Sequence, residues 1–391
     1  MKNLTLTLIV ILSILNFGFS QTTNQPTNPS TQKITRPAQV TFFYPIGTNG
    51  ITSYNYSNQV SLNWLFGLNG GVEGIEVAGL FNVNDGDVTG LQASGLFNLT
   101  KGNTMGLQTA GLFNANMGNS QSLQASGIFN FNLGEMQGIQ ATGIFNTNIG
   151  NAQGVQASGI FNSNIGDYQG VQASGILNAN VGQFTGGQVS GILNVVTDTL
   201  TGTQVGLVNY ATQAEGVQVG LVNISAKKSE KLLPIGLVSI VNGGLQELEI
   251  SGGDAVYANV NFKLGVPKFY TIFKAGYTSF GGEPIFSTGL GFGSEIGIKN
   301  NHKINIDLSS NSLSDLNFDT YNYNSLSKLD LNYKYALTKN FSVFAGPSFN
   351  ILLSENEKML LNVPYSIHQK TYSNVEFNSW VGFNIGTSVR L

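Results

Sequence analysis

Cysteine is absent from the 391-residue chain, and histidine and charged residues are scarce. The absence of cysteine excludes disulfides, thiolate metal sites and cysteine nucleophiles. Only 10% of the residues are charged and the formal net charge is −3, so the composition offers no basic surface for nucleic acid. The two histidines, His302 and His368, have no nucleophile or ligand partner at a meaningful spacing. We expect both to be solvated surface residues.

Long hydrophobic runs are also lacking, because no stretch beyond the N-terminus approaches about 18 uninterrupted apolar residues, the length of a helical membrane span. The N-terminus combines Lys2, an apolar run and a small residue at Ser20, which predicts a signal peptide over 1–20 that is cleaved before Gln21. Residues 21–38 are rich in Thr, Asn, Gln and Pro, a composition typical of a disordered tether.

A 16-residue repeat is the dominant feature and occupies residues 72–243. Each copy has a central glycine. A glutamine lies three residues before it from Gln92 to Gln188, and an asparagine lies three residues after it from Asn82 to Asn194. The central glycines are Gly79, Gly95, Gly111, Gly127, Gly143, Gly159, Gly175 and Gly191, with looser copies at Gly206, Gly220 and Gly236. Glycine, asparagine and threonine alternate with β-branched or aromatic residues, which predicts strands and turns rather than helices.

Two β arrangements fit this repeat: a parallel β-solenoid, in which each copy is one coil, and an antiparallel meander, in which each copy is one strand and a turn. Stacked coils bring identical residues to about 4.8 Å from one another, where like charges repel and amides hydrogen-bond. Between residues 90 and 190 only Lys101, Glu135 and Asp167 are charged. The copies from Gln204 onward lose one residue between Gln and Asn, which a corner absorbs more readily than a strand. We therefore favour the solenoid.

The apolar residues of each copy are expected to fill the narrow core of the solenoid. In one copy these are Ile139, Ala141 and Phe145. The Gln and Asn rows are expected to form amide ladders, and the glycines to turn corners or to adopt left-handed backbone. The surface would then be regular and neutral, made of amides, hydroxyls and glycines.

The 16-residue period ends near residue 244, and about eight longer strands with alternating apolar and polar residues follow in 244–391. Several reach the 9 to 11 residues that cross a bilayer. Together with the signal peptide, they predict an antiparallel outer-membrane-type β-barrel; the alternative is a soluble β-sandwich with one wet face. Two strand-like runs, 39–47 and 59–67 within 39–71, are expected to join this barrel. Candidate members of its aromatic girdle are Tyr270, Tyr277, Tyr333, Tyr335 and Trp380.

Four segments carry a resemblance to a known family: GVQVGLVN (216–223), PIGLVSIVNGG (234–244), VPKFYTIFKAGY (266–277) and FSVFAGPSFNIL (341–352). They resemble the surface-repeat-containing proteins of Gram-negative bacteria, in which such repeats precede a β-rich C-terminal region. The resemblance covers most of 39–391. It implies a surface or outer-membrane location and no known enzymatic activity.

Two short motifs are similar to known binding loops. Asn82, Asn84, Asp85 and Asp87 in NVNDGDV are similar to a calcium loop, but the closing Glu is missing and the next copies lose the acids, so an ordinary turn is preferred. GLGFGSEIG (289–297) is glycine-rich but has no helix after it, so we discount it as a nucleotide loop. The sequence thus predicts no catalytic, cofactor-binding or metal site.

The all-β reading, a 16-residue-repeat parallel β-solenoid plus an antiparallel outer-membrane-type barrel, predicts a non-enzymatic cell-envelope protein. Its role would be structural, display or adhesive, anchored in the outer membrane at the cell surface. The expected partners are outer-membrane lipid and an extracellular protein or glycan, without nucleic acid. Two alternatives stay open: one large antiparallel barrel of about twenty strands that acts as a pore or transporter, and a soluble secreted binding module.

Overall fold

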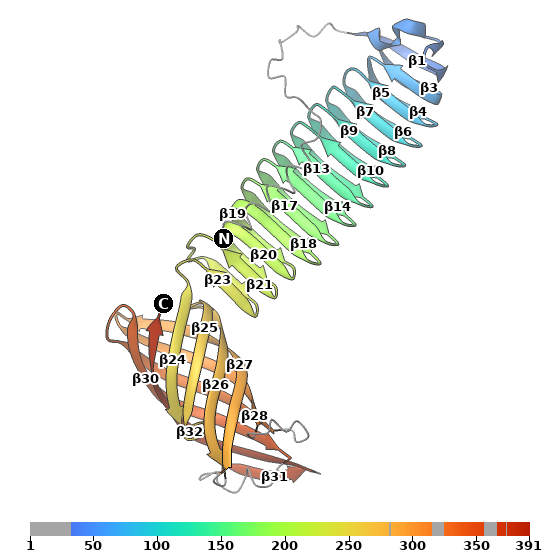
Figure 1. Cartoon of the computed structure of the whole chain (residues 1–391). Helices are drawn as coiled ribbons and strands as arrows, with labels where there is room; N and C mark the ends of the chain where they lie inside the picture. Colours follow the sequence, from blue (N-terminus) through green and yellow to red (C-terminus); the bar gives the residue numbers. More distant parts are fainter. Residues whose placement is uncertain (1–32, 281–282, 315–323, 356–365, 373) are drawn as a thin grey trace. The chain divides into compact units, whose positions relative to one another are not determined.

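The structure is a computed structural model that describes residues 33–280, 283–314, 324–355, 366–372 and 374–391. Over these residues the strands form two sheets, one of 23 strands and one of nine (Figure 1). The predicted signal peptide over 1–20 and the tether residues 21–32 lie outside the described residues. Strand β1 (Ile34–Phe43) begins inside the segment expected to be disordered, so the tether prediction is wrong for 34–38.

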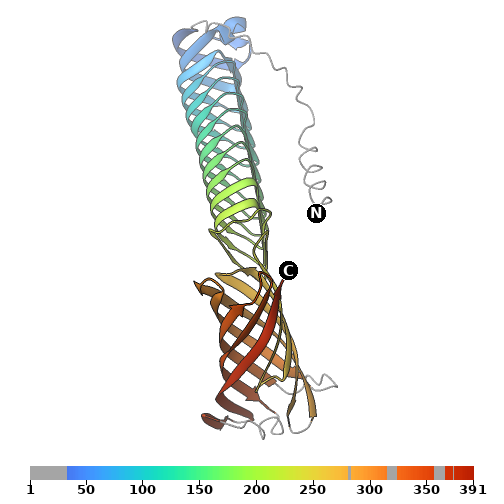
Figure 2. The same ribbon diagram turned by 90° about the vertical axis from the view of Figure 1, so that its left-hand side faces the viewer.

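The larger sheet is a parallel β-solenoid in which each 16-residue coil has a long and a short strand (Figures 1 and 2). The longer face consists of β4 (Gly71–Ala78), β6 (Val88–Ser94), β8 (Thr104–Ala110), β10 (Ser120–Ser126), β12 (Met136–Thr142), β14 (Ala152–Ser158), β16 (Tyr168–Ser174), β18 (Phe184–Ser190) and β22 (Leu232–Ile235). The shorter face consists of β5 (Phe81–Asn84), β7 (Phe97–Thr100), β9 (Phe113–Asn116), β11 (Phe129–Asn132), β13 (Phe145–Ile149), β15 (Phe161–Ile165), β17 (Leu177–Val181), β21 (Val222–Ser225) and β23 (Val238–Val241). Three strands contribute to both faces: β3 (Tyr56–Asn69), β19 (Leu193–Val205) and β20 (Val208–Val219).

The register of the solenoid follows the period of the sequence. Gln124 pairs with Gln140, and Asn130 with Asn146, in parallel strands. The parallel pairing confirms the solenoid and rules out both the meander and the single large antiparallel barrel. Where the later copies lose a residue, Asn194 still pairs with Asn209, because the loss falls at the corner between β19 and β20.

The prediction that the apolar side chains of each copy fill the solenoid core is wrong. In the coil that begins at Met136, the buried side chains are Met136, Gln140, Asn146 and Asn148, whereas Ile139 is exposed and Ala141 and Phe145 are partly exposed. The apolar residues do share one side of each strand, as predicted, but the opposite, polar side faces the core. Burial of these amides is tolerated because each one hydrogen-bonds to its own equivalents in the neighbouring coils.

Close stacking of the coils explains one glycine row. Gly154 has φ +132°, and a Cβ atom there would lie 1.9 Å from the carbonyl oxygen of Gly138 in the previous coil. Only glycine fits both the backbone conformation and the spacing.

The N-terminal end of the solenoid is formed by the strands that were expected to join the barrel. β1 pairs with β2 (Ile46–Gly47) and with β3, next to the short 3₁₀ helix η1 (Gly50–Asn55). β3 pairs with β4 and β5, so the runs 39–47 and 59–67 belong to the solenoid sheet, and the barrel prediction for them is wrong. The barrel needs no such strands, because β24 and β32 close it.

The smaller sheet is an eight-stranded antiparallel barrel with one additional strand. Its strands are β24 (Leu245–Gly253), β25 (Ala258–Val266), β26 (Phe269–Phe280), β27 (Glu283–Lys299), β28 (His302–Ser314), β29 (Asn324–Ala336), β30 (Phe341–Ser354) and β32 (Val375–Arg390), with β31 (His368–Tyr372) paired to β32. Pairing of β24 with β32, for example Ile250 with Thr387, closes the ring. A closed barrel replaces the alternative of an open sandwich.

Three of the five aromatic residues expected in a girdle lie on the surface of the barrel, and two do not. Tyr277, Tyr333 and Tyr335 are exposed on the barrel, but Tyr270 and Trp380 are buried inside it. Trp380 Nε1 donates to Asp254 Oδ2 at 2.6 Å, and Asp254 Oδ1 accepts a second hydrogen bond from the backbone N–H of Phe383 at 2.8 Å. Alternation along the strand does not distinguish an inward aromatic ring that has a polar partner from an outward one.

Candidate functional site: a charged barrel interior and a regular solenoid surface

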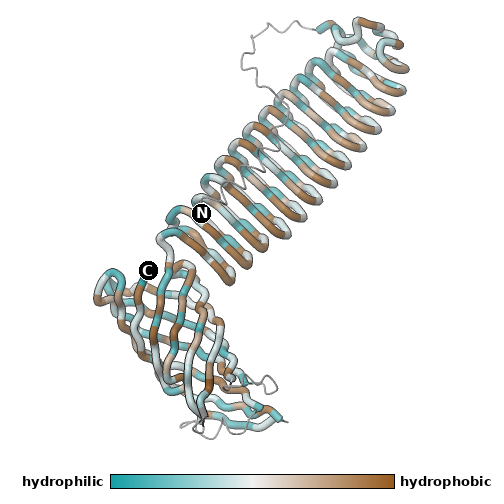
Figure 3. The backbone as a smooth tube through the Cα atoms, in the orientation of Figure 1, coloured by the Kyte–Doolittle hydropathy of each residue, from teal (hydrophilic) through white to brown (hydrophobic). Residues whose placement is uncertain are grey.

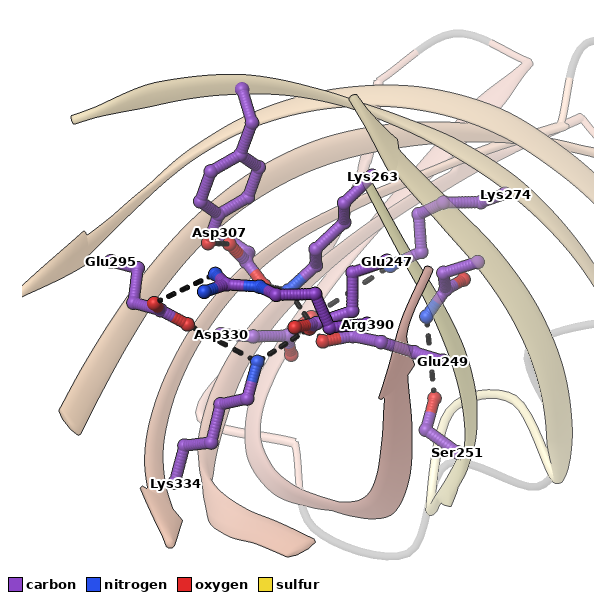
Figure 4. Close-up of polar contacts among 12 residues, drawn as sticks. Glu247, Glu249, Ser251, Lys263, Lys274, Glu295, Asp307, Asp330, Lys334 and Arg390 are labelled. Atoms are coloured by element: carbon purple, nitrogen blue, oxygen red, sulfur yellow. Dashed lines mark hydrogen bonds and ion pairs between the residues drawn. The ribbon is translucent and has the colours of Figure 1, made fainter. Parts of the chain in front are cut away.

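Charged side chains converge inside the barrel. Lys263 on β25 has 1% of its side chain exposed, and its Nζ lies 2.7 Å from both Glu249 Oε1 on β24 and Asp307 Oδ2 on β28 (Figure 4). The Tyr270 hydroxyl donates to Asp307 Oδ1 at 2.5 Å. Because β24 and β28 are not neighbours in the sheet, this ammonium group links opposite parts of the barrel wall.

A second ion-pair group centres on Glu295 of β27. Lys334 of β29 pairs with both Glu247 of β24 and Glu295 Oε2, the latter at 3.1 Å. Glu295 Oε1 lies 3.4 Å from Arg390 Nη2 (Figure 4). The same oxygen lies 2.6 Å from Lys303 Nζ. One buried carboxylate therefore serves three cations from three different strands.

The third group contains Asp330, whose oxygens lie 3.8 Å from Lys274 Nζ and 3.4 Å from Lys328 Nζ. Lys274 Nζ also donates to Ser309 Oγ at 3.1 Å. A buried charge without a partner is strongly unfavourable, and pairing offsets much of that cost. These contacts pair the buried charges of the described barrel interior with one another.

The outward face of the barrel is apolar. Its exposed side chains alternate with the buried polar ones, as Leu329 and Leu331 do with Asp330, and Ile306 and Leu308 with Asp307. Other exposed apolar residues on this face are Ile250, Val260, Leu290, Phe292, Ile296, Phe349, Val381, Phe383, Ile385 and Val389. This polarity is the reverse of that of a water-soluble barrel.

Amide ladders run through the solenoid core in two opposite directions. The Gln140 Nε2 donates backward to Gln124 Oε1 at 2.7 Å, and this contact repeats in the other coils from Gln108 to Gln218. The Asn146 Nδ2 donates forward to Asn162 Oδ1 at 2.9 Å and also to a backbone carbonyl, and this pattern repeats along the Asn row. The opposed directions make the amide dipoles of the two rows partly cancel.

Glu76 ends the Gln ladder and is the one carboxylate of the described solenoid core. Its Oε2 accepts from Gln92 Nε2 at 2.8 Å and Asn84 Nδ2 at 2.6 Å, and its Oε1 accepts from Asn69 and Asn63. Burial raises its pKa from the ordinary 4.5 to about 7, although these four hydrogen bonds act in the opposite direction. A carboxylate suits this position because the amide rows direct only donors toward it.

A polar groove of about 870 Å³ follows one corner of the solenoid from Asp87 to Thr185. Its rim includes exposed glutamines, one per coil: Gln121, Gln137, Gln153 and Gln169. Within the described residues their side chains make no hydrogen bond, unlike the buried Gln row. The groove therefore presents free amides at a spacing of about 4.8 Å, which could contact an extended polymer.

The other rim residues of this groove stabilise the corner. Asp87 Oδ1 accepts the backbone N–H of Asn103 at 2.7 Å, and Asp167 Oδ1 accepts that of Gln183 at 2.9 Å. Asn119 does the same for Glu135. The repeated Asn and Asp at this corner thus have a structural role in each turn.

The two short motifs, NVNDGDV and GLGFGSEIG, have strand and turn geometry in the described residues. Asn82 and Asn84 point into the core, whereas Asp85 pairs with Lys101 at 2.8 Å on the surface, so the oxygens of NVNDGDV do not converge. The glycine-rich segment 289–297 is continuous strand in β27. His302 contacts Tyr333, and His368 is exposed. Across the described ranges, no three His, Asp or Glu side chains are grouped so that they could hold a metal ion.

Sequence reasoning missed the inward direction of the amides and the barrel ion pairs. One signal for the amides was present: the Gln and Asn positions stay the same from coil to coil, whereas the apolar positions vary among Leu, Ile and Val. No comparable signal identified the ion pairs, because Lys334 and Glu247 are 87 residues apart.

Among the described residues, no helix has the length and apolar character required to cross a membrane. No protein-family model, curated protein or solved structure matches the chain.

Proposed function

We propose that this protein is an exported, non-enzymatic component of the cell envelope, anchored in the outer membrane by its barrel and displaying the solenoid at the cell surface in a structural or adhesive role. The observation that carries the proposal is the polarity of the barrel, which has paired charges inside and large apolar side chains outside. The hydropathy colouring in Figure 3 follows this alternation along the barrel strands.

Lipid is the solvent that matches this outer face. Exposed Leu, Ile, Val and Phe side chains on a closed ring of strands satisfy the two demands of a bilayer, an apolar surface and no open sheet edge. The strands are long enough, since β28 and β29 have 13 residues each and β30 has 14, against about 9 to 11 needed for a crossing.

The proposed partners are outer-membrane lipid for the barrel and an extracellular protein or glycan for the solenoid. The free glutamine row of the polar groove supports the second partner, because it offers hydrogen-bonding groups at a constant interval. The resemblance to surface-repeat-containing proteins agrees with this location.

The proposal is tested by washing membranes with urea at high pH. An integral barrel stays in the outer-membrane fraction, whereas a soluble secreted module is released and would overturn the proposal. Protease treatment of whole cells then reports on display, since a surface solenoid is cleaved without cell lysis.

A substitution pair separates a membrane barrel from a water-exposed one. Leu329→Arg places a charge at the middle of β29 on the outward face, where lipid contact would cost about 2 to 4 kcal/mol and water contact almost nothing. Gln153→Arg, at an exposed solenoid position, is the control. Equal yields of both folded variants in the membrane fraction would contradict lipid contact at Leu329.

A further inference from the structure

The solenoid carries an apolar surface that nothing in the described chain covers. We call it the apolar edge: the Leu or Ile that follows the central glycine, together with the adjoining Phe row. Nine members of the Leu/Ile row are between 37% and 53% exposed: Leu80, Leu96, Leu112, Ile144, Ile160, Ile176, Ile192, Leu207 and Leu221. Figure 3 shows apolar segments recurring in successive coils.

The Phe row makes the apolar edge rigid. From Phe81 to Phe129 the rings of successive coils stack with centroids 4.6 to 4.8 Å apart and planes within 4° of parallel. Each ring is only partly buried by its neighbours. A preformed surface of this kind loses little side-chain entropy when it is covered.

The apolar edge is large enough for a stable interface. At roughly 70 Å² of apolar surface per half-exposed Leu or Ile, nine such side chains present on the order of 600 Å². The Phe row adds to this, so the sum approaches the ~800 Å² that each partner buries in a standard protein interface. It also equals or exceeds the ~300 to 600 Å² of the largest apolar patch on a typical monomer.

Charge favours a second copy of the same chain as the occupant. Between residues 90 and 190 the only charged residues are Lys101, Glu135 and Asp167, and all three lie at or next to the opposite corner of the coil. Over these coils, two copies can therefore bring their apolar edges together without like-charge repulsion. Because every coil carries the same residue type at the same height, the surface is self-complementary, as a two-fold interface requires.

We infer that two copies of this protein pair side by side, with their solenoids parallel, through the apolar edge. The parallel orientation rests on the proposed outer-membrane anchorage. In each copy β23 ends at Val241 and β24 begins at Leu245, so two barrels inserted in the same sense join the C-terminal ends of both solenoids at the same membrane face. In this pair each residue of the Leu/Ile row lies opposite its own equivalent in the partner.

The absence of native cysteine gives a clean test by single substitutions in the full-length protein in membranes. Leu96→Cys, Ile144→Cys and Ile192→Cys sample the start, middle and end of the row, and Gln137→Cys is an exposed control away from the edge. After mild oxidation, we expect all three row variants to form disulfide-linked dimers at least tenfold more abundantly than the control.

Each other outcome overturns the parallel pair. Crosslinking at Ile144→Cys alone indicates an antiparallel pair, and no crosslinking above the control indicates another occupant of the edge, such as lipid.

Charge repulsion tests the same surface in a second way. The double variant Ile144→Lys with Ile176→Lys places cations on the apolar edge, and Gln137→Lys with Gln169→Lys is its control. Only the first double variant should lose the mass of a dimer in detergent. Retention after the urea wash is scored separately, so failure of pairing is distinguishable from failure of anchorage.

Discussion

The solenoid and the barrel both bury polar side chains and expose apolar ones, but they satisfy the buried groups in different ways. In the solenoid, each core amide bonds to the same residue type one coil away, as Gln140 does with Gln124. In the barrel, unlike charges from distant strands converge, as Lys263, Glu249 and Asp307 do. Translation repeats every charge at a short distance and so excludes ions from the solenoid core, whereas the irregular barrel wall can place opposite charges face to face.

The largest effect is expected in the barrel. Lys263→Met removes the cation from two buried carboxylates, so the free energy of unfolding of the barrel should fall by about 3 to 5 kcal/mol. The measurement is a urea titration in detergent followed by fluorescence of Trp380 in a Trp64→Phe background, since the chain has two tryptophans. Lys268→Met, at an exposed turn position, is the control. Coincident midpoints for both variants would show that the pairing contributes nothing to barrel stability.

The second largest effect is expected when the buried Gln ladder of the solenoid is interrupted. Gln140→Leu leaves Gln124 Oε1 without its donor and Gln156 Nε2 without its acceptor, at a cost of about 2 to 4 kcal/mol for two buried groups. Gln137→Leu changes an exposed glutamine of the same coil and should be nearly neutral. Amide hydrogen exchange of β12 and β14 measures the difference. Equal protection in the two variants would argue against the inward ladder.

Glu76 is a titratable side chain of the described solenoid core, so the stability of the solenoid near it should depend on pH. Its pKa is about 7 in the folded chain and near 4.5 when unfolded, so the folded state binds the proton more tightly. The stabilisation is fully present below pH 4.5 and is lost as the pH rises through 7, a change of about 3 kcal/mol. Hydrogen exchange of β3 and β4 at pH 5 and pH 8 detects it.

Glu76→Gln is the matched variant for this pH series. It should remove the pH dependence of exchange in β3 and β4, because Gln does not titrate. A variant that retained the same pH profile as the unsubstituted chain would assign the effect to a different group.

The smallest effect concerns the spacing between coils. Gly154→Ala forces a Cβ against the Gly138 carbonyl at a left-handed φ, with an expected cost of about 1 to 3 kcal/mol. Gly187→Ala is the control, because its Cβ would meet no atom within 4 Å. Thermal unfolding of the two variants provides the comparison. Equal unfolding temperatures for the two variants would show that successive coils are farther apart than in the structure.

Much of the architecture followed from the sequence by itself. The 16-residue spacing and the scarcity of charge predicted parallel coils, because stacking repeats every residue and penalises repeated charge. Two-residue alternation in strands such as β29 separated the two faces correctly. The expected absence of a site stays a prediction.

Only the tertiary structure decided which face is inside. Alternation is symmetric between the two faces, so it does not tell whether Phe145 or Asn146 is buried; that depends on whether the amides find partners in neighbouring coils. The place of β1 and β3 at the end of the solenoid, and the contact of Lys334 with Glu247, were decided in the same way. Local sequence sets the conformation of a strand, but its partners depend on which distant surfaces and charges the closed fold brings together.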